Sequence, residues 1–213
     1  MEEKKIAVMI YPHFSMQEIA CLTAALSVWH ARTIDVFASS SDVVTTEDGF
    51  QVVPGKTFEE FNVQEYCCLM LPGILNPLPA LFDERNIAFL RNLAGQNIVI
   101  AAISSAPLLL AKAGLLDHKE FTSGVWEEIA EHFSFFPRRN FRHRPLVHDG
   151  NIITAIGFAF REFAEETLRA IGIDCAGGVF AGIDREYSEE ELTFRMGKED
   201  FAEFLDEYQK YAP

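Results

Sequence analysis

The sequence lacks the features of membrane-spanning, secreted and nucleic-acid-binding proteins. No apolar run approaches the roughly 20 residues that cross a bilayer, and the start has no cleavage-site pattern of a secretory signal. Basic residues are scarce, because 18 Lys and Arg stand against 32 Asp and Glu, giving a formal charge of -14. Such a charge opposes attraction to phosphate backbones and to anionic lipid. We therefore expect a cytoplasmic protein that binds neither nucleic acid nor membrane.

Cysteine is also scarce, and its four positions show neither the paired spacing of metal ligands nor the density of a disulfide scaffold. Cys67 and Cys68 are adjacent in an apolar run, which favours a buried strand over a redox pair. With Cys21 and Cys175, they are interpreted as reduced, mostly buried thiols, and no metal or cofactor is expected. No helix-turn-helix module follows the domain, which disfavours a transcription regulator.

Strand-like and helix-like segments alternate along most of the chain. With 213 residues, 49% of them hydrophobic, it is long enough to bury the core of a single domain. Apolar runs predict strands over residues 5–11, 33–38, 66–71 and 97–103, and apolar residues at helical spacing predict helices over residues 17–31, 78–94, 106–113, 126–132 and 160–171. This alternation predicts an α/β fold, with a doubly wound, mainly parallel sheet covered by helices on both faces.

Three further segments complete the expected fold. Polar residues 39–48 form a loop, and residues 50–54 form a short edge strand. The Asp149-Gly150 pair between apolar runs is a strong turn signal, so residues 146–155 are expected to form a hairpin.

From residue 174 the composition changes to an acidic, aromatic-rich tail. Its residues 199–211 have a helical pattern with one apolar face. We expect residues 174–213 to form an extension of a single domain over 1–213, packed on the domain or at a dimer contact.

Ligands of open α/β sheets bind beyond the carboxyl ends of the strands. Three loops are expected to meet there: the one leading to Glu18, the turn at Gly73-Ile74, and the corner between a strand and a helix at Ser104-Ser105. A side chain on such a tight corner is exposed, and the following helix start supplies backbone N–H groups. The spacing predicts a pocket around Ser104, with Glu18 as its acidic partner and an N–H of Gly73-Ile74 completing an oxyanion hole.

These motifs carry a resemblance that covers nearly the whole chain. Glu18 after the first strand, the Leu-Pro-Gly turn at 71–73, the Ala-Ala-Ile-x-x-x-Pro corner, Ala-Gly-Leu-Leu at 113–116 and Asp-Gly-Asn-Ile-Ile-Thr-Ala at 149–155 resemble the superfamily of the intracellular protease PfpI and the parkinsonism-associated deglycase DJ-1. The resemblance implies a flavodoxin-like fold of the class I glutamine amidotransferase type, usually dimeric. Members act as cysteine peptidases, glyoxalases, deglycases, chaperones or non-enzymatic sensors.

The chain departs from this pattern where its enzymes carry their chemistry. The resemblance implies a cysteine at the corner and in many relatives a histidine near Phe121–Gly124, but this chain has Ser104 and Ser123. Ile74 replaces the second glycine of the turn while keeping its N–H. A thiol is readily activated to a thiolate, whereas a serine needs a positioned base, and a carboxylate of ordinary pKa is a poor one.

Several residues are open to two interpretations. His13 lies in the same loop as Glu18 and is either an exposed loop residue or a base that reaches the pocket, and Ser105 replaces Ser104 if the corner is shifted by one residue. Trp126 packs in the core or borders the pocket. The basic stretch over 137–144 is a solvated loop, an anion site or a contact with the acidic surface of a second subunit.

The sequence therefore supports two alternative functions. The first is a catalytically silent member that binds a small ligand or a partner in the Ser104 pocket, and mechanism favours it. The second is a hydrolase of the peptidase or amidase type, in which Ser104 attacks a carbonyl, Glu18 accepts or orients the proton, and the N–H groups of Ile74 and Ser105 hold the oxyanion. A homodimer is expected from the resemblance.

Overall fold

The computed structural model describes residues 4–174 together with positions 188, 198, 199 and 202. The chain divides into two compact units, Met1–Phe180 and Ala181–Pro213, and the fold below belongs to the first. The expected extension over 174–213, with its terminal helix over 199–211, lies outside the described residues apart from isolated positions. Its packing, and the single-domain organisation of residues 1–213, stay predictions.

A seven-stranded sheet forms the middle layer, in the order β5-β2-β1-β6-β7-β9-β8. Neighbouring strands are parallel except for the β8–β9 hairpin, which is antiparallel, as the turn at Asp149-Gly150 predicted. The strands are β1 (Lys5–Met9), β2 (Ile34–Ala38), β5 (Lys56–Thr57), β6 (Tyr66–Leu71), β7 (Val99–Ile103), β8 (Leu146–Asp149) and β9 (Ile152–Ala155). The predicted α/β architecture with a mainly parallel sheet is confirmed.

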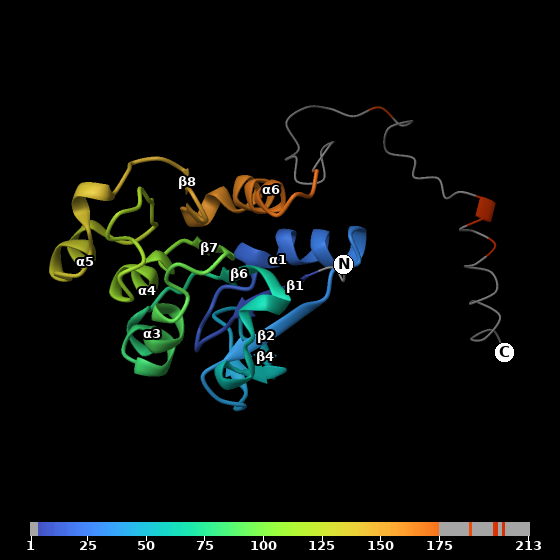
Figure 1. The fold of residues 1–213 in the computed structure, drawn as a ribbon, viewed down its shortest axis with the longest axis horizontal. Coiled ribbons are helices and arrows are strands. Elements are labelled where there is room, and N and C mark those ends of the chain that lie inside the picture. Colours follow the sequence, from blue (N-terminus) through green and yellow to red (C-terminus); the bar gives the residue numbers. More distant parts are fainter. Residues whose placement is uncertain (1–3, 175–187, 189–197, 200–201, 203–213) are drawn as a thin grey trace. The chain divides into compact units, whose positions relative to one another are not determined.

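Helices cover both faces of this sheet. Figure 1 shows α1 (Gln17–Ala24) and α6 (Phe160–Ala170) on one side, and α3 (Glu84–Arg91) and α4 (Pro107–Lys112) on the other. The remaining helical segments are α2 (Leu78–Leu81), α5 (Glu127–His132), and the 3₁₀ turns η2 (Phe58–Glu60), η3 (Val63–Glu65), η4 (Arg138–Asn140) and η5 (Gly157–Ala159). Every helix within residues 4–174 is too short or too polar to traverse a bilayer.

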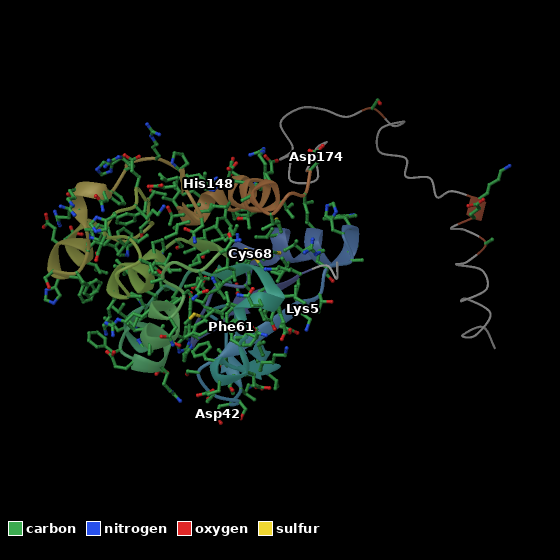
Figure 2. The ribbon with its side chains drawn as sticks, in the orientation of Figure 1. Lys5, Asp42, Phe61, Cys68, His148 and Asp174 are labelled. Atoms are coloured by element: carbon green, nitrogen blue, oxygen red, sulfur yellow. The ribbon has the colours of Figure 1, made fainter. Side chains whose placement is uncertain are left out.

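The hydrophobic core lies on both faces of the central strands. β1, β6 and β7 are buried almost throughout, as strands covered on both sides must be, so their sequences read as continuous apolar runs. Cys68 is fully buried in β6 and lies in the middle of the body in Figure 2, whereas Asp42 lies at its periphery. The strand interpretation of the Cys67-Cys68 run is confirmed. Cys21, Cys67 and Cys68 are free thiols, but Cys21 and Cys67 are only partly buried, and Cys175 lies outside the described residues.

Two of the expected helices are interrupted. The helix expected over 17–31 widens after α1 into a π-helical segment, η1 (Ala25–Trp29), and ends where Ala31 takes a left-handed backbone conformation. The helix expected over 78–94 is two helices, because Asp83 has an extended backbone and caps α3 by accepting the Arg85 N–H at 3.1 Å. The apolar periodicity continues across both breaks and therefore hides them.

The expected loop over 39–48 and edge strand over 50–54 are confirmed in part: the loop contains a two-residue strand, and the expected strand is shorter and lies outside the main sheet. β3 (Val44–Thr45) and β4 (Gln51–Val52) pair with each other in a separate two-stranded sheet, and β5 is the strand at that edge of the main sheet. The turn between β3 and β4 contains Asp48 and Gly49, and Gly49 has a φ of 87°. This is the same Asp-Gly turn signal that predicted the β8–β9 hairpin.

Candidate functional site

Ser104 forms the sharp corner between β7 and α4. Its φ is 61°, a left-handed conformation that costs a residue with a side chain about 1 kcal/mol or more. The corner is held by its backbone: the Ser104 N–H donates to the Ala155 carbonyl at 2.8 Å, and the Ser104 carbonyl accepts from the Gly124 N–H at 2.7 Å and the Ser123 hydroxyl at 2.9 Å. Ser123 therefore braces the corner through its main chain and is itself buried.

Glu18, in the first turn of α1, reaches this corner. Its Oε2 accepts the Gly73 N–H at 2.9 Å, and its carboxyl group also interacts with the Ser104 hydroxyl. Two glycines make room for this approach. A Cβ built on Gly73 would stand 2.0 Å from Oε2 of Glu18, and one on Gly157 would stand 2.5 Å from Oε1. The pair of Ser104 and Glu18 that the sequence predicted is thus brought together.

Burial raises the pKa of Glu18 above its ordinary value of 4.5. The Ser104 hydroxyl and the Gly73 N–H act against that shift, while the charges of Glu47 and Asp48 add to it. Beneath the site, the fully buried Tyr11 hydroxyl donates to the Pro72 carbonyl, and burial followed by the nearby Glu18 charge raises the pKa of Tyr11 well above its ordinary value. Negative charge at Glu18 is therefore poorly compensated by the protein.

The Gly73-Ile74 turn is tied to the residue after Ser104. The Ser105 hydroxyl donates to the Ile74 carbonyl, and the Ile74 N–H donates back to Ser105 Oγ at 3.1 Å. The Ile74 N–H is therefore occupied, so the expected oxyanion hole of Ile74 and Ser105 is not open on the Ile74 side. The Ser105 N–H meets no acceptor within residues 4–174.

A pocket of about 180 Å³ lies over Ser104. Of the residues that line it, none in the described part of the chain is a histidine, cysteine, lysine or arginine. Trp126 borders the pocket with 68% of its surface exposed, so it does not pack in the core. The full lining is Glu18, Glu47, Ile74, Leu75, Pro77, Ser104, Ser105, Gly124, Val125, Trp126 and Ile129.

His13 is not positioned to act as a base for Ser104. Its backbone has a φ of 62°, its N–H donates to the Thr45 carbonyl at 2.7 Å, and its side chain is exposed outside the pocket lining. Glu47 lines the pocket instead, and sequence reasoning missed it because residues 39–48 were interpreted as a loop. The turn signal at Asp48-Gly49 would have predicted that hairpin.

Three of the four arginines in the basic stretch over 137–144 make side-chain contacts with their own chain. Arg138 pairs with Glu131 at 3.3 Å, Arg142 pairs with Glu120 at 2.5 Å, and an Arg139 N–H donates to the Asp117 carbonyl at 3.3 Å. These contacts favour the solvated-loop interpretation over an anion site. No cluster of three or more His, Cys, Asp or Glu side chains able to hold a metal occurs among the described residues.

Comparison with known proteins bears on the resemblance noted in the sequence. The family model described as the DJ-1/PfpI family matches residues 4–170. The chain belongs to the DJ-1/PfpI family. The match covers every element of the described fold, from β1 through α6, and so includes both Glu18 and Ser104.

Relatives within the DJ-1/PfpI family differ in activity. The chain is 30% identical over 156 residues to isonitrile hydratase of Pseudomonas putida, a match that covers 67% of this chain and 66% of that protein. It is 25% identical over 117 residues to deglycase PfpI of Pyrococcus furiosus, covering 55% and 64% of the two chains. The chain thus spans somewhat less than two thirds of each of these relatives.

Solved structures of the DJ-1/PfpI superfamily share the fold. A DJ-1 superfamily protein from Agrobacterium tumefaciens, 20% identical, superposes with a TM-score of 0.72 over 99% of this chain and 100% of the other. A ThiJ/PfpI family protein from Bacillus anthracis, 24% identical, gives 0.71 over 83% and 86%. These likenesses confirm the flavodoxin-like fold.

Proposed function

We propose that the chain is a ligand-binding member of the DJ-1/PfpI family that holds a small molecule in the Ser104 pocket without breaking or forming covalent bonds in it. The observation that carries the proposal is the make-up of the pocket. The Ser104 hydroxyl faces the carboxyl group of Glu18, and none of the described lining residues is a histidine, cysteine or cation.

The chemistry of that pair supports binding over turnover. A serine nucleophile needs a base that takes its proton. The carboxylate of an acid with a raised pKa is a stronger base than an ordinary carboxylate, but it is still far weaker than the serine alkoxide that it would have to generate. The oxyanion of an acyl-transfer step needs converging N–H donors, and the Ile74 N–H is occupied by Ser105 Oγ. Binding needs neither of these features.

A hydrolase of the peptidase or amidase type is the second candidate. Its support is the left-handed backbone of Ser104, because strained residues at a strand-to-helix corner present nucleophiles in other enzymes. The Ser105 N–H, which meets no acceptor within residues 4–174, supplies one oxyanion donor. Hydration chemistry, as the name of the Pseudomonas putida relative states for that protein, belongs in the same test.

Turnover and binding measured side by side distinguish the two candidates. We expect the wild-type chain to convert esters, peptides, 2-oxoaldehydes and isonitriles no faster than its Ser104→Ala variant does, with Ser134→Ala as the exposed control. A fragment screen by thermal shift should still return compounds whose binding is altered by Ser104→Ala and kept in Ser134→Ala. Turnover that depends on Ser104 would establish the hydrolase instead, and a screen without any pocket-dependent compound would remove the ligand-binding proposal.

We also propose that the chain works as a homodimer in the cytoplasm, which the family resemblance and the acidic composition support. Light scattering that gives a monomer at micromolar concentration would contradict the dimer.

A further inference from the structure

The Ser104 pocket adjoins a second, larger hollow. A groove of about 620 Å³ runs alongside it, and both are lined by Leu75, Pro77 and Ile129. Because three residues are shared, the pocket and the groove are adjacent parts of one surface region. We name it the extended site. Its outer part is formed by the segment after β6 together with α5, which is drawn in yellow in Figure 1.

The two parts of the extended site differ in chemistry. The groove is mostly apolar: Leu78, Phe82 and Phe133 line it, and Leu75, Leu78 and Phe82 are 80%, 48% and 63% exposed. Apolar side chains gathered at this exposure mark a surface that something covers. The inner pocket brings together the polar side chains of Glu18, Glu47, Ser104 and Ser105 among apolar neighbours, and its volume of about 180 Å³ suits a head group, whereas the groove suits an apolar tail.

The charge of the inner pocket determines which head group fits. Two carboxyl groups line it, on Glu18 and Glu47, and Asp48 stands near enough to raise the pKa of Glu18 further. Glu47 Oε2 accepts the Leu75 N–H at 3.2 Å, which fixes that carboxylate at the junction of pocket and groove. No lysine, arginine or histidine of the described residues lines the inner pocket. Within the described residues, the partly buried Glu18 carboxylate is faced by the Gly73 N–H and the Ser104 hydroxyl but by no cation of the lining, so a cationic ligand would complete its charge compensation.

We propose that the extended site binds a small organic amine, with its ammonium group between Glu18 and Glu47 and an aromatic or branched apolar tail in the groove. An ammonium group offers three donors to the carboxylates, and the exposed Trp126 ring beside it adds an aromatic face suited to a cation. Carboxylates and phosphates are repelled by the same residues. The inference rests on the proposed binding function of the Ser104 pocket and adds the class of its ligand.

Four probes test head and tail separately: phenethylamine, phenethyl alcohol and phenylacetate, which are of nearly equal size and differ in the head group, and ethylamine, which lacks the aromatic tail. We expect calorimetry at neutral pH to show phenethylamine binding about tenfold or more tightly than the alcohol, because a charge-assisted hydrogen bond is roughly twice as strong as a neutral one. Phenylacetate should not bind measurably. Ethylamine should bind about tenfold or more weakly than phenethylamine, since it leaves the groove empty.

Matched variants locate the binding. Glu47→Gln should weaken phenethylamine severalfold and leave the alcohol unchanged, whereas Glu162→Gln, an exposed carboxylate on α6, should alter neither. Leu75→Ala should weaken phenethylamine but not ethylamine, with Val28→Ala as the exposed apolar control. Because Glu47, Leu75, Glu162 and Val28 are all exposed, these variants are expected to fold.

The remaining outcomes distinguish failure of the amine inference from failure of the proposed function. Equal affinity for amine and alcohol, or tighter binding of phenylacetate, would remove the amine class while leaving the pocket a binding site. A Leu75→Ala variant that changed the oligomeric state instead of amine affinity would make the groove a protein interface. Binding of none of the four probes would also reject the amine, while the fragment screen decides the binding function independently. Chemical conversion of the bound amine would overturn the silent function and keep the ligand class.

Discussion

Two carboxylates, Asp35 on β2 and Glu18 on α1, have opposite electrostatic environments. Asp35 Oδ2 accepts hydrogen bonds from Lys56 Nζ at 2.8 Å and from the Tyr66 hydroxyl at 2.6 Å, and Lys5 lies 3.7 Å away. Burial pushes the pKa of Asp35 up, but the hydrogen bonds from Lys56 and Tyr66 outweigh it and lower the pKa below 3.8. Burial, followed by the hydrogen bond to Asp35, raises the pKa of Tyr66 to about 12.

Burial raises the pKa of Glu18, the charges of Glu47 and Asp48 add to that rise, and the hydrogen bonds from the Ser104 hydroxyl and the Gly73 N–H do not cancel it. Within the described residues, cations compensate the carboxylate that links strands, whereas no cation lines the pocket beside Glu18. A carboxylate with no opposite charge beside it adds little to the free energy of unfolding of the unbound protein. The environment of Glu18 is therefore better explained by ligand binding.

The largest expected effect sharpens this contrast through the glycine that admits Glu18. Gly73→Ala places a Cβ within 2.0 Å of Glu18 Oε2 and 2.4 Å of Ser104 Cβ, so the carboxylate must leave its position. We expect a loss of about 1–3 kcal/mol in the free energy of unfolding, measured by urea titration, together with loss of ligand binding. Gly55→Ala is the control, because the nearest atom to its Cβ is 3.9 Å away. Equal effects of the two variants would show that Gly73 is not sterically required.

The second prediction concerns Lys56, the cation that pairs with Asp35. Lys56→Met leaves Asp35 with a weaker set of partners, and we expect it to lower the free energy of unfolding by about 1 kcal/mol. Glu18→Gln removes no ion pair and should cost less than Lys56→Met in the same urea experiment. A larger loss from Glu18→Gln would mean that the pocket carboxylate is structural, and the comparison would fail.

The two carboxylates should also give opposite pH dependence. The raised pKa of Glu18 means that the folded protein keeps a proton that the unfolded chain releases near pH 4.5, so this contribution to stability is present below that pH and is lost as the pH rises through the folded value. For Asp35 the contribution is present above pH 3.8 and is lost as the pH falls through its lowered value. Urea unfolding at a series of pH values should therefore show wild type losing stability relative to Glu18→Gln as the pH rises. Relative to Asp35→Asn, wild type should lose stability as the pH falls, and slopes of the same sign would refute the assignment.

The smallest expected effect concerns the backbone of the corner. Ser104→Gly relieves the left-handed conformation at φ 61° but adds freedom to the unfolded chain, so we expect a change between no effect and a stabilisation of about 1 kcal/mol. Ser134→Gly, at an exposed position outside the left-handed region, should destabilise by a few tenths of a kcal/mol. Thermal unfolding of both variants measures the difference, and a clear destabilisation by Ser104→Gly would mean that its side chain contributes more than the strain costs.

The sequence predicted the central sheet because the buried strands are short, continuous apolar runs that helices interrupt. β6 was predicted to the residue over 66–71. Breaks inside helices were missed, since the cap at Asp83 and the π-helical turn at Ala25 leave the apolar spacing intact. The hairpin at 44–52 was missed because its strands are two residues long, too short for an alternating pattern to register.

For the site, local signals located the corner but not the bonds across it. A strand that turns abruptly into a helix identified Ser104, and the family motif identified Glu18. That the Ile74 N–H is taken by Ser105 depends on the side-chain conformation across two loops 31 residues apart, which spacing does not contain. Glu47 enters the pocket from a hairpin outside the main sheet, and that position follows from tertiary packing alone.

The β3–β4 hairpin supplies a charged side chain to the pocket without being part of the seven-stranded sheet. β3 and β4 form their own small sheet, and their turn carries Glu47 and Asp48 to the mouth of the pocket. Replacing Glu47 and Asp48 with residues of the opposite sign would change the charge beside the pocket without altering any strand of the seven-stranded sheet. The same residues bond to Met16 and Leu75, so this turn also links the two loops on either side of the pocket.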